Sequence, residues 1–155
     1  MNLKKGVGRF LKYGTLISSF CFIAVTLIQI YARFFMDSAP SWTEEAARFF
    51  FIYAMSFAAG LAMKGGYYVH FDVIYNKMSI RQQNILSIIV SLFTIVLFLI
   101  LTVYAIQFVK VGIIEHSPSL GVSMAIAFAS MVIMGAFITV YAIWDLLKSI
   151  KKLKH

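Results

Sequence analysis

Few residues of this chain have side chains that could perform catalysis, bind a metal or carry a proton. The single cysteine, Cys21, has no second thiol to pair with, and the three histidines, His70, His116 and His155, fall in connections or at the C-terminus. Haem ligation in a helical bundle needs histidines on facing helices, and nucleophilic catalysis needs a base beside the nucleophile. The sequence therefore predicts a chain that is not an enzyme and has no catalytic, metal-binding or cofactor-binding residue.

Four long hydrophobic segments separate these few polar residues. The chain is 61% hydrophobic and 13% charged, with a mean hydropathy of +0.87, whereas a soluble domain keeps about a quarter of its residues charged. No Asp, Glu, Lys, Arg or His occurs in the ranges 14–32, 49–63, 85–109 and 120–144. About 20 helical residues cross the roughly 30 Å of hydrocarbon in a bilayer. The pattern predicts an all-α integral membrane protein with four spanning helices.

Local signals place the ends of these helices at about 13–35, 41–64, 80–112 and 118–147, in one domain that covers residues 1–155. Ser41 with Glu44, and Ser79 with Gln82, have the spacing of capping boxes. Ser117 followed by Pro118 suits the N-cap and first position of the fourth helix.

Small residues at intervals of four predict where the helices pack, because they let backbones approach closely in a membrane. Two such series are on the second helix and one is on the fourth: Ala54, Ala58, Ala62; Ser56, Gly60; Gly121, Ala125, Ala129. Large aromatic residues are expected on the opposite faces, toward lipid or a larger partner: Phe49, Phe50, Phe57, Phe93, Phe98.

The basic residues indicate how the chain is oriented. They cluster before the first segment, after the second and after the fourth: Lys4, Lys5, Arg9, Lys12; Lys64, Lys77, Arg81; Lys148, Lys151, Lys152, Lys154. Cytoplasmic connections carry the excess of Lys and Arg, so both termini are expected in the cytoplasm. The formal charge of +8 then reflects topology and contact with anionic lipid, and nucleic acid is not an expected partner.

The membrane interior lacks the groups that a self-sufficient ion-coupled transporter needs. Such a transporter normally keeps an ionisable residue at bilayer depth, and the four apolar ranges contain none. An accessory subunit is the simplest interpretation. Two alternatives stay open: a small transporter or channel assembled from several copies, and a structural four-helix membrane protein.

The start of the second helix is the most distinctive polar segment. Glu44 and Glu45 fall in its first turn, where the helix dipole favours carboxylates, and Arg48 follows at a spacing that allows an ion pair. Trp42 suits an interfacial anchor. The segment is interpreted either as a well-anchored helix end or as a docking surface on the outer face.

Through these residues, the chain resembles the DctQ-type small membrane subunits of tripartite ATP-independent periplasmic (TRAP) transporters. The resemblance covers Trp42, Glu44, Glu45 and Arg48, the small residues that end the second helix, and then His70 and Asp72. His70 and Asp72 are one residue closer together than in some relatives. The Ser-Pro-Ser-Leu-Gly run from Ser117 adds to the similarity.

The resemblance implies a scaffold that braces a large DctM-type subunit and works with a periplasmic substrate-binding protein. Sodium ions and substrate are expected in the large subunit, and the substrate would be an organic acid such as a C4-dicarboxylate or, as a weak preference, sialic acid. Membrane lipid is expected between the subunits. The resemblance makes Trp42, Glu44, Glu45, Arg48, Glu115 and His116 interface candidates, and His70 and Asp72 a cytoplasmic loop motif.

Overall fold

A computed structural model describes residues 2–36, 40–65 and 78–154 of the chain. It contains four long helices: α1 (Asn2–Phe35), α2 (Ser41–Gly65), α4 (Ile80–Gly112) and α5 (Ala125–Lys154). All four are long and apolar enough to cross a membrane. The all-α, four-helix membrane architecture predicted from the sequence is therefore confirmed.

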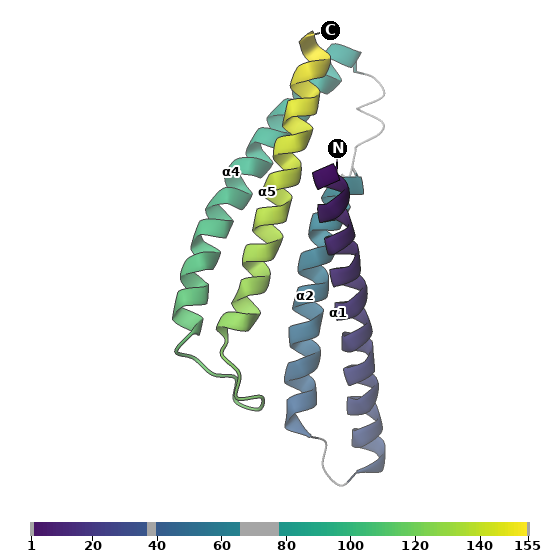
Figure 1. The fold of residues 1–155 in the computed structure, drawn as a ribbon, viewed down its shortest axis with the longest axis vertical. Coiled ribbons are helices and arrows are strands. Elements are labelled where there is room, and N and C mark those ends of the chain that lie inside the picture. The colour runs from purple at the N-terminus through teal and green to yellow at the C-terminus, as the bar shows by residue number, and fades with distance from the viewer. Residues whose placement is uncertain (1, 37–39, 66–77, 155) are drawn as a thin grey trace.

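The helices form two antiparallel hairpins that lie side by side in a single layer (Figure 1). Helix α1 packs on α2, α4 packs on α5, and the two hairpins meet where α2 packs on α5. The order across the layer is therefore α1, α2, α5, α4. The start of α1, the end of α2, the start of α4 and the end of α5 are all directed toward the same end of the molecule.

This order determines which side chains are buried. In the most apolar window of α2 and of α5, 33% of the residues are buried, against 6% in α1 and in α4. Leu11, Phe57 and Tyr141 form the central cluster, contributed by α1, α2 and α5. Among the described residues, α1 brings only a narrow face to this cluster and α4 brings none, and both helices leave large apolar side chains exposed along most of their length.

Helix α1 starts earlier than the sequence suggested, at Asn2 and not near residue 13. The basic residues that precede the apolar segment are therefore helical, with no Pro among them to stop the helix. Leu11 is fully buried, and Val7 packs against the same core cluster. Packing of these two side chains against the core stabilises the additional helical turns at the N-terminus.

Helix α5 starts later than predicted, at Ala125 and not at residue 118, and it ends beyond residue 147, at Lys154. Ser117 and Pro118 lie in the connection before it, so their predicted capping role is wrong. Gly121 has a φ of +67°, a left-handed conformation that interrupts helical geometry and favours glycine. Gly121 therefore cannot belong to the predicted small-residue stripe of the fourth helix. The Ser123 hydroxyl accepts a hydrogen bond from the amide of Ala125 and so caps the true start.

The two predicted capping boxes have different outcomes. At α4 the box is confirmed: Ser79 Oγ accepts from the Gln82 amide, and the Gln82 side chain accepts from the Ser79 amide. At α2 the helix already includes Ser41. The Pro40 carbonyl accepts bonds from the amide and hydroxyl of Thr43, which satisfies the first turn in another way.

The predicted packing face of α2 is confirmed only in part, and one aromatic residue was misplaced. Ala54, Ser56 and Gly60 are buried, whereas Ala62 is exposed. Phe57 is only 9% exposed and belongs to the core cluster, in contrast to the lipid-facing position expected for it. Its ring occupies the space beside Gly14 of α1, where a Cβ atom would lie 2.9 Å from the ring carbons. The absence of a side chain at residue 14 thus brings Phe57 into the interior.

The close approach at Gly14 can be tested by Gly14→Ala, with Gly6→Ala as a matched control in the same helix. Overpacking against Phe57 is expected to lower the free energy of unfolding by roughly 1–3 kcal/mol. A Cβ at Gly6 meets nothing within 4 Å, so alanine there is expected to stabilise the helix by about 0.5–1 kcal/mol. Thermal unfolding in detergent micelles measures both changes, and equal Tm shifts for the two variants would contradict the packing described for Phe57.

Two tyrosines allow a matched test of interhelical hydrogen bonding. The Tyr53 hydroxyl donates to the Ile126 carbonyl oxygen at 2.7 Å, which links α2 to α5. The hydroxyl of buried Tyr141 has no hydrogen-bond partner among the described residues. Tyr53→Phe is therefore expected to lower the free energy of unfolding by about 0.5–1.5 kcal/mol. Tyr141→Phe is expected to leave it unchanged or to raise it slightly. Tm values for the two variants check the order, and a larger loss for Tyr141→Phe would refute it.

Candidate functional site

The predicted interface residues gather at the end of the molecule opposite the chain termini. The first turn of α2 supplies Trp42, Glu44, Glu45 and Arg48, and the connection 113–124 between α4 and α5 supplies Glu115 and His116. Figure 1 shows both segments toward the lower end of the layer. This set of residues, together with the connection 113–124, is called the outer rim below.

The connection 113–124 has a defined backbone. His116 and Ser123 form an isolated antiparallel bridge, and the amide of Ser117 donates to the Val122 carbonyl at 2.8 Å. The amide of Met124 donates to the Glu115 carbonyl at 2.9 Å. These bonds close a tight turn over residues 117–122, with Gly121 in its left-handed conformation.

The carboxylate of Glu45 binds this turn. Its Oε2 atom accepts hydrogen bonds from the Ser117 hydroxyl, from the Ser119 amide at 3.1 Å and from the Leu120 amide at 3.0 Å. The Ser117 hydroxyl also accepts from the Leu120 amide at 3.4 Å. One side chain of the first hairpin therefore satisfies three donors of the second. Charge-assisted bonds of this kind are stronger than neutral ones.

Glu44 is arranged differently from its neighbour. Its Oε1 atom lies 3.8 Å from Arg48 Nη2, and the two side chains are 63% and 70% exposed. The ion pair predicted from their spacing is therefore present, but it lies in solvent, where such pairs contribute little to stability. Trp42 is 43% exposed beside this pair, as an interfacial anchor requires.

Glu115 and His116 are exposed on the connection, immediately before the turn that Glu45 binds. The His116 Nδ1 atom lies 3.3 Å from the Ile114 carbonyl oxygen, and the Ile114 side chain is 84% exposed. Among the described residues, no group of three or more His, Cys, Asp or Glu side chains is placed to hold a metal ion. The outer rim offers two accessible carboxylates, an imidazole and apolar side chains, which suit contact with another macromolecule.

The structure separates residues that the sequence had grouped. Glu45 turns inward to the connection, whereas Glu44 and Arg48 stay on the surface. Ser117, Ser119 and Leu120 were not identified as its partners. The only available signal was the turn composition of Ser-Pro-Ser-Leu-Gly. His70 and Asp72 lie outside the residues that the structure describes.

The role of Glu45 can be tested by Glu45→Ala, with Glu44→Ala as the matched control one residue away. Removal of Glu45 leaves the Ser119 and Leu120 amides without their acceptor, so we expect a lower Tm and faster hydrogen exchange at both amides. Glu44→Ala removes only an exposed ion pair and is expected to change neither. Unaltered exchange in Glu45→Ala would show that the connection keeps its shape without this carboxylate.

Comparison with known proteins identifies the family. Residues 22–152 match the sequence profile described as "Tripartite ATP-independent periplasmic transporters, DctQ component". The chain is 20% identical over 152 residues to a putative TRAP transporter small permease protein of Haemophilus influenzae, and the match covers 98% of this chain and 92% of that protein.

A second relative is longer. The chain is 34% identical over 84 residues to the isethionate TRAP transporter permease protein DctMQ of Oleidesulfovibrio alaskensis. That match covers 53% of this chain and 13% of the relative. With the profile match across most of the sequence and four membrane-spanning helices, the chain belongs to the DctQ component family of TRAP transporters and is a multi-pass inner-membrane protein.

Proposed function

We propose that this chain is a scaffold subunit that braces the large membrane subunit of a sodium-driven TRAP transporter for an organic acid. The profile match over residues 22–152 is the observation that carries the proposal. The single-layer fold supports it, because the outer helices α1 and α4 expose long apolar faces that a larger membrane protein can cover.

The charge distribution supports a division of labour between the subunits. No Asp, Glu, Lys, Arg or His occurs in the apolar ranges of the four helices, so this chain offers no such group at bilayer depth for coupling ions to substrate. We therefore assign the sodium and substrate sites to a DctM-type partner. The relative from Oleidesulfovibrio alaskensis is named as a DctMQ permease, which supports association of the two subunit types.

The orientation follows from the same charges. The basic ends of α1, α2 and α5 are directed toward one end of the layer, and the excess of Lys and Arg there supports a cytoplasmic location for that end. Both termini are then cytoplasmic, and the outer rim faces the periplasm. A periplasmic substrate-binding protein would meet Trp42, Glu44, Arg48, Glu115 and His116 there.

The substrate is proposed only as a class. The relative that is named for isethionate carries an organic anion, and organic acids such as C4-dicarboxylates and sialic acid are the corresponding candidates for this chain. Sialic acid, a weak preference among these acids, is the first to test.

Reconstitution tests the scaffold function directly. The chain is expected to co-purify with its large partner, and proteoliposomes are expected to take up substrate only when they contain both subunits, a binding protein and an inward sodium gradient. The chain alone should give no flux. Uptake by the purified chain alone would overturn the proposal and favour a small homo-oligomeric transporter or channel. Absence of any large membrane partner would favour a structural four-helix protein.

Charge reversal tests docking at the outer rim. Because Glu45 binds the connection, the informative changes are Glu44→Lys and Glu115→Lys, whose side chains are exposed. Each is expected to raise the binding-protein concentration that gives half-maximal uptake by roughly fivefold, with the maximal rate retained, because rim charges act mainly on association. Asp145→Lys, with the same change in charge near the other end of the layer, is the control. An equal effect of all three variants would refute docking at this rim.

A further inference from the structure

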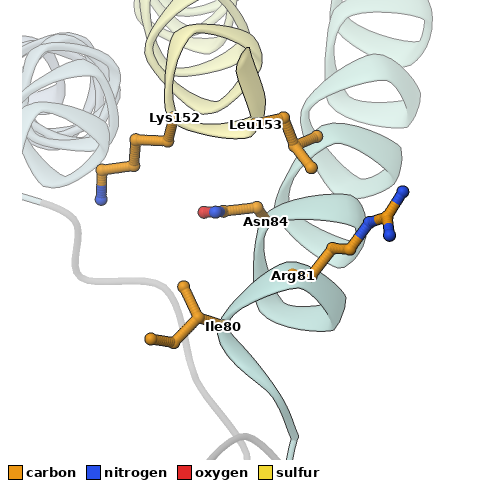
Figure 2. Close-up of a pocket in the computed structure, with 5 residues that line it drawn as sticks. All are labelled: Ile80, Arg81, Asn84, Lys152 and Leu153. Carbon is orange, nitrogen blue, oxygen red and sulfur yellow. The ribbon is translucent and has the colours of Figure 1, made fainter. Parts of the chain in front are cut away.

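A cavity of about 350 Å³ opens between the first turn of α4 and the last turns of α5. Ile80, Arg81 and Asn84 line it from α4, and Lys152 and Leu153 line it from α5. Figure 2 shows the Asn84 amide and the Lys152 side chain extending toward the same side, with Ile80 nearby and Arg81 directed along the other flank of α4. The cavity lies at the end of the molecule opposite the outer rim.

The polar groups of this cavity have no partner within the described part of the chain. None of the hydrogen bonds or ion pairs there involves the side chains of Arg81, Asn84 or Lys152. The described residues of α5 after Asp145 include Lys148, Lys151 and Lys152 and no carboxylate. Among the described residues, the cavity therefore lies in a region of excess positive charge, which favours an anionic ligand.

The position of Asn84 indicates where that ligand comes from. Asn84 immediately precedes the apolar range 85–109, so its amide marks the level at which α4 leaves the hydrocarbon. Arg81 lies about 4.5 Å further along the helix axis. Ile80, which is 79% exposed, and Leu153 place aliphatic surface beside the polar groups. The cavity thus offers two cations, an amide donor and aliphatic side chains at the edge of the bilayer. This combination suits the phosphodiester and glycerol backbone of a phospholipid better than it suits a free phosphate ion.

We propose that this cavity binds the headgroup phosphate of an anionic glycerophospholipid, with Lys152 and the Asn84 amide directed to the phosphate and Arg81, on the other flank of α4, adding positive charge to the surrounding surface. The lipid then joins the start of α4 to the end of α5 at the cytoplasmic side. This inference does not depend on the proposed transport function, because it concerns residues of this chain alone.

Binding of defined lipids to the full-length chain in detergent micelles tests the site. Native mass spectrometry or a fluorescent analogue would be used to titrate short-chain phosphatidylglycerol, phosphatidylcholine and inorganic phosphate. We expect phosphatidylglycerol to bind, phosphatidylcholine to bind at least roughly tenfold more weakly, and inorganic phosphate at the same concentrations not to compete. Equal binding of the two lipids would refute recognition by charge, and full competition by inorganic phosphate would make this a site for a soluble anion.

Paired variants separate a built site from general surface charge. Arg81→Gln with Lys152→Gln removes two cations of the cavity, and Lys148→Gln with Lys151→Gln removes two cations of α5 outside it. The first pair is expected to weaken phosphatidylglycerol binding by roughly tenfold or more, and the second by less than about threefold. Equal losses would show that only the surface potential attracts the lipid, which would overturn the proposal.

A third variant tests the amide without any change in charge. Asn84→Leu keeps both cations, retains helical propensity and fills part of the cavity, so it is expected to weaken binding while the circular dichroism spectrum and Tm stay close to those of the unaltered chain. Unchanged lipid affinity in Asn84→Leu would contradict the assignment of this amide to the phosphate.

Discussion

The arrangement of this protein depends on one seam, the contact between α2 and α5. Each hairpin is held by its own extensive helix packing, but the two hairpins meet where α2 packs on α5. Hydrophobic burial cannot drive this contact in lipid, because acyl chains are as apolar as the side chains. Shape and polar contacts must hold it instead. Gly60 provides the shape: a Cβ there would lie 3.1 Å from Phe137 Cβ of α5.

Polar contacts are distributed along this seam. Glu45 binds the connection 113–124 at the outer rim, and Tyr53 bonds to Ile126 further in. Toward the other end, Lys4 Nζ lies 5.9 Å from the Tyr141 ring centroid and 5.5 Å from that of Trp144, so α1 also contacts α5. These contacts lie at several depths, which opposes both separation and rotation of the hairpins.

Periodic and compositional features of the chain were readable from its sequence, and long-range polar contacts were not. The charge-free ranges predicted four spanning helices, and the spacing of Ser79 and Gln82 predicted the cap of α4, because both signals are local. The late start of α5 combines a local feature, Gly121 in its left-handed conformation, with a contact that no local signal predicts: Glu45, more than 70 residues away in sequence, accepts from the Ser119 and Leu120 amides. The same limit applies to Phe57, whose burial depends on Gly14 in another helix.

A layer one helix thick has a mechanical consequence. Helix axes in contact lie about 8–10 Å apart, so the molecule forms a plate with no second layer to resist bending about its central line. Glu45 ties the two halves together at one end of this central line, far from the core cluster, where a bond has a long lever arm against splaying of the hairpins within the layer.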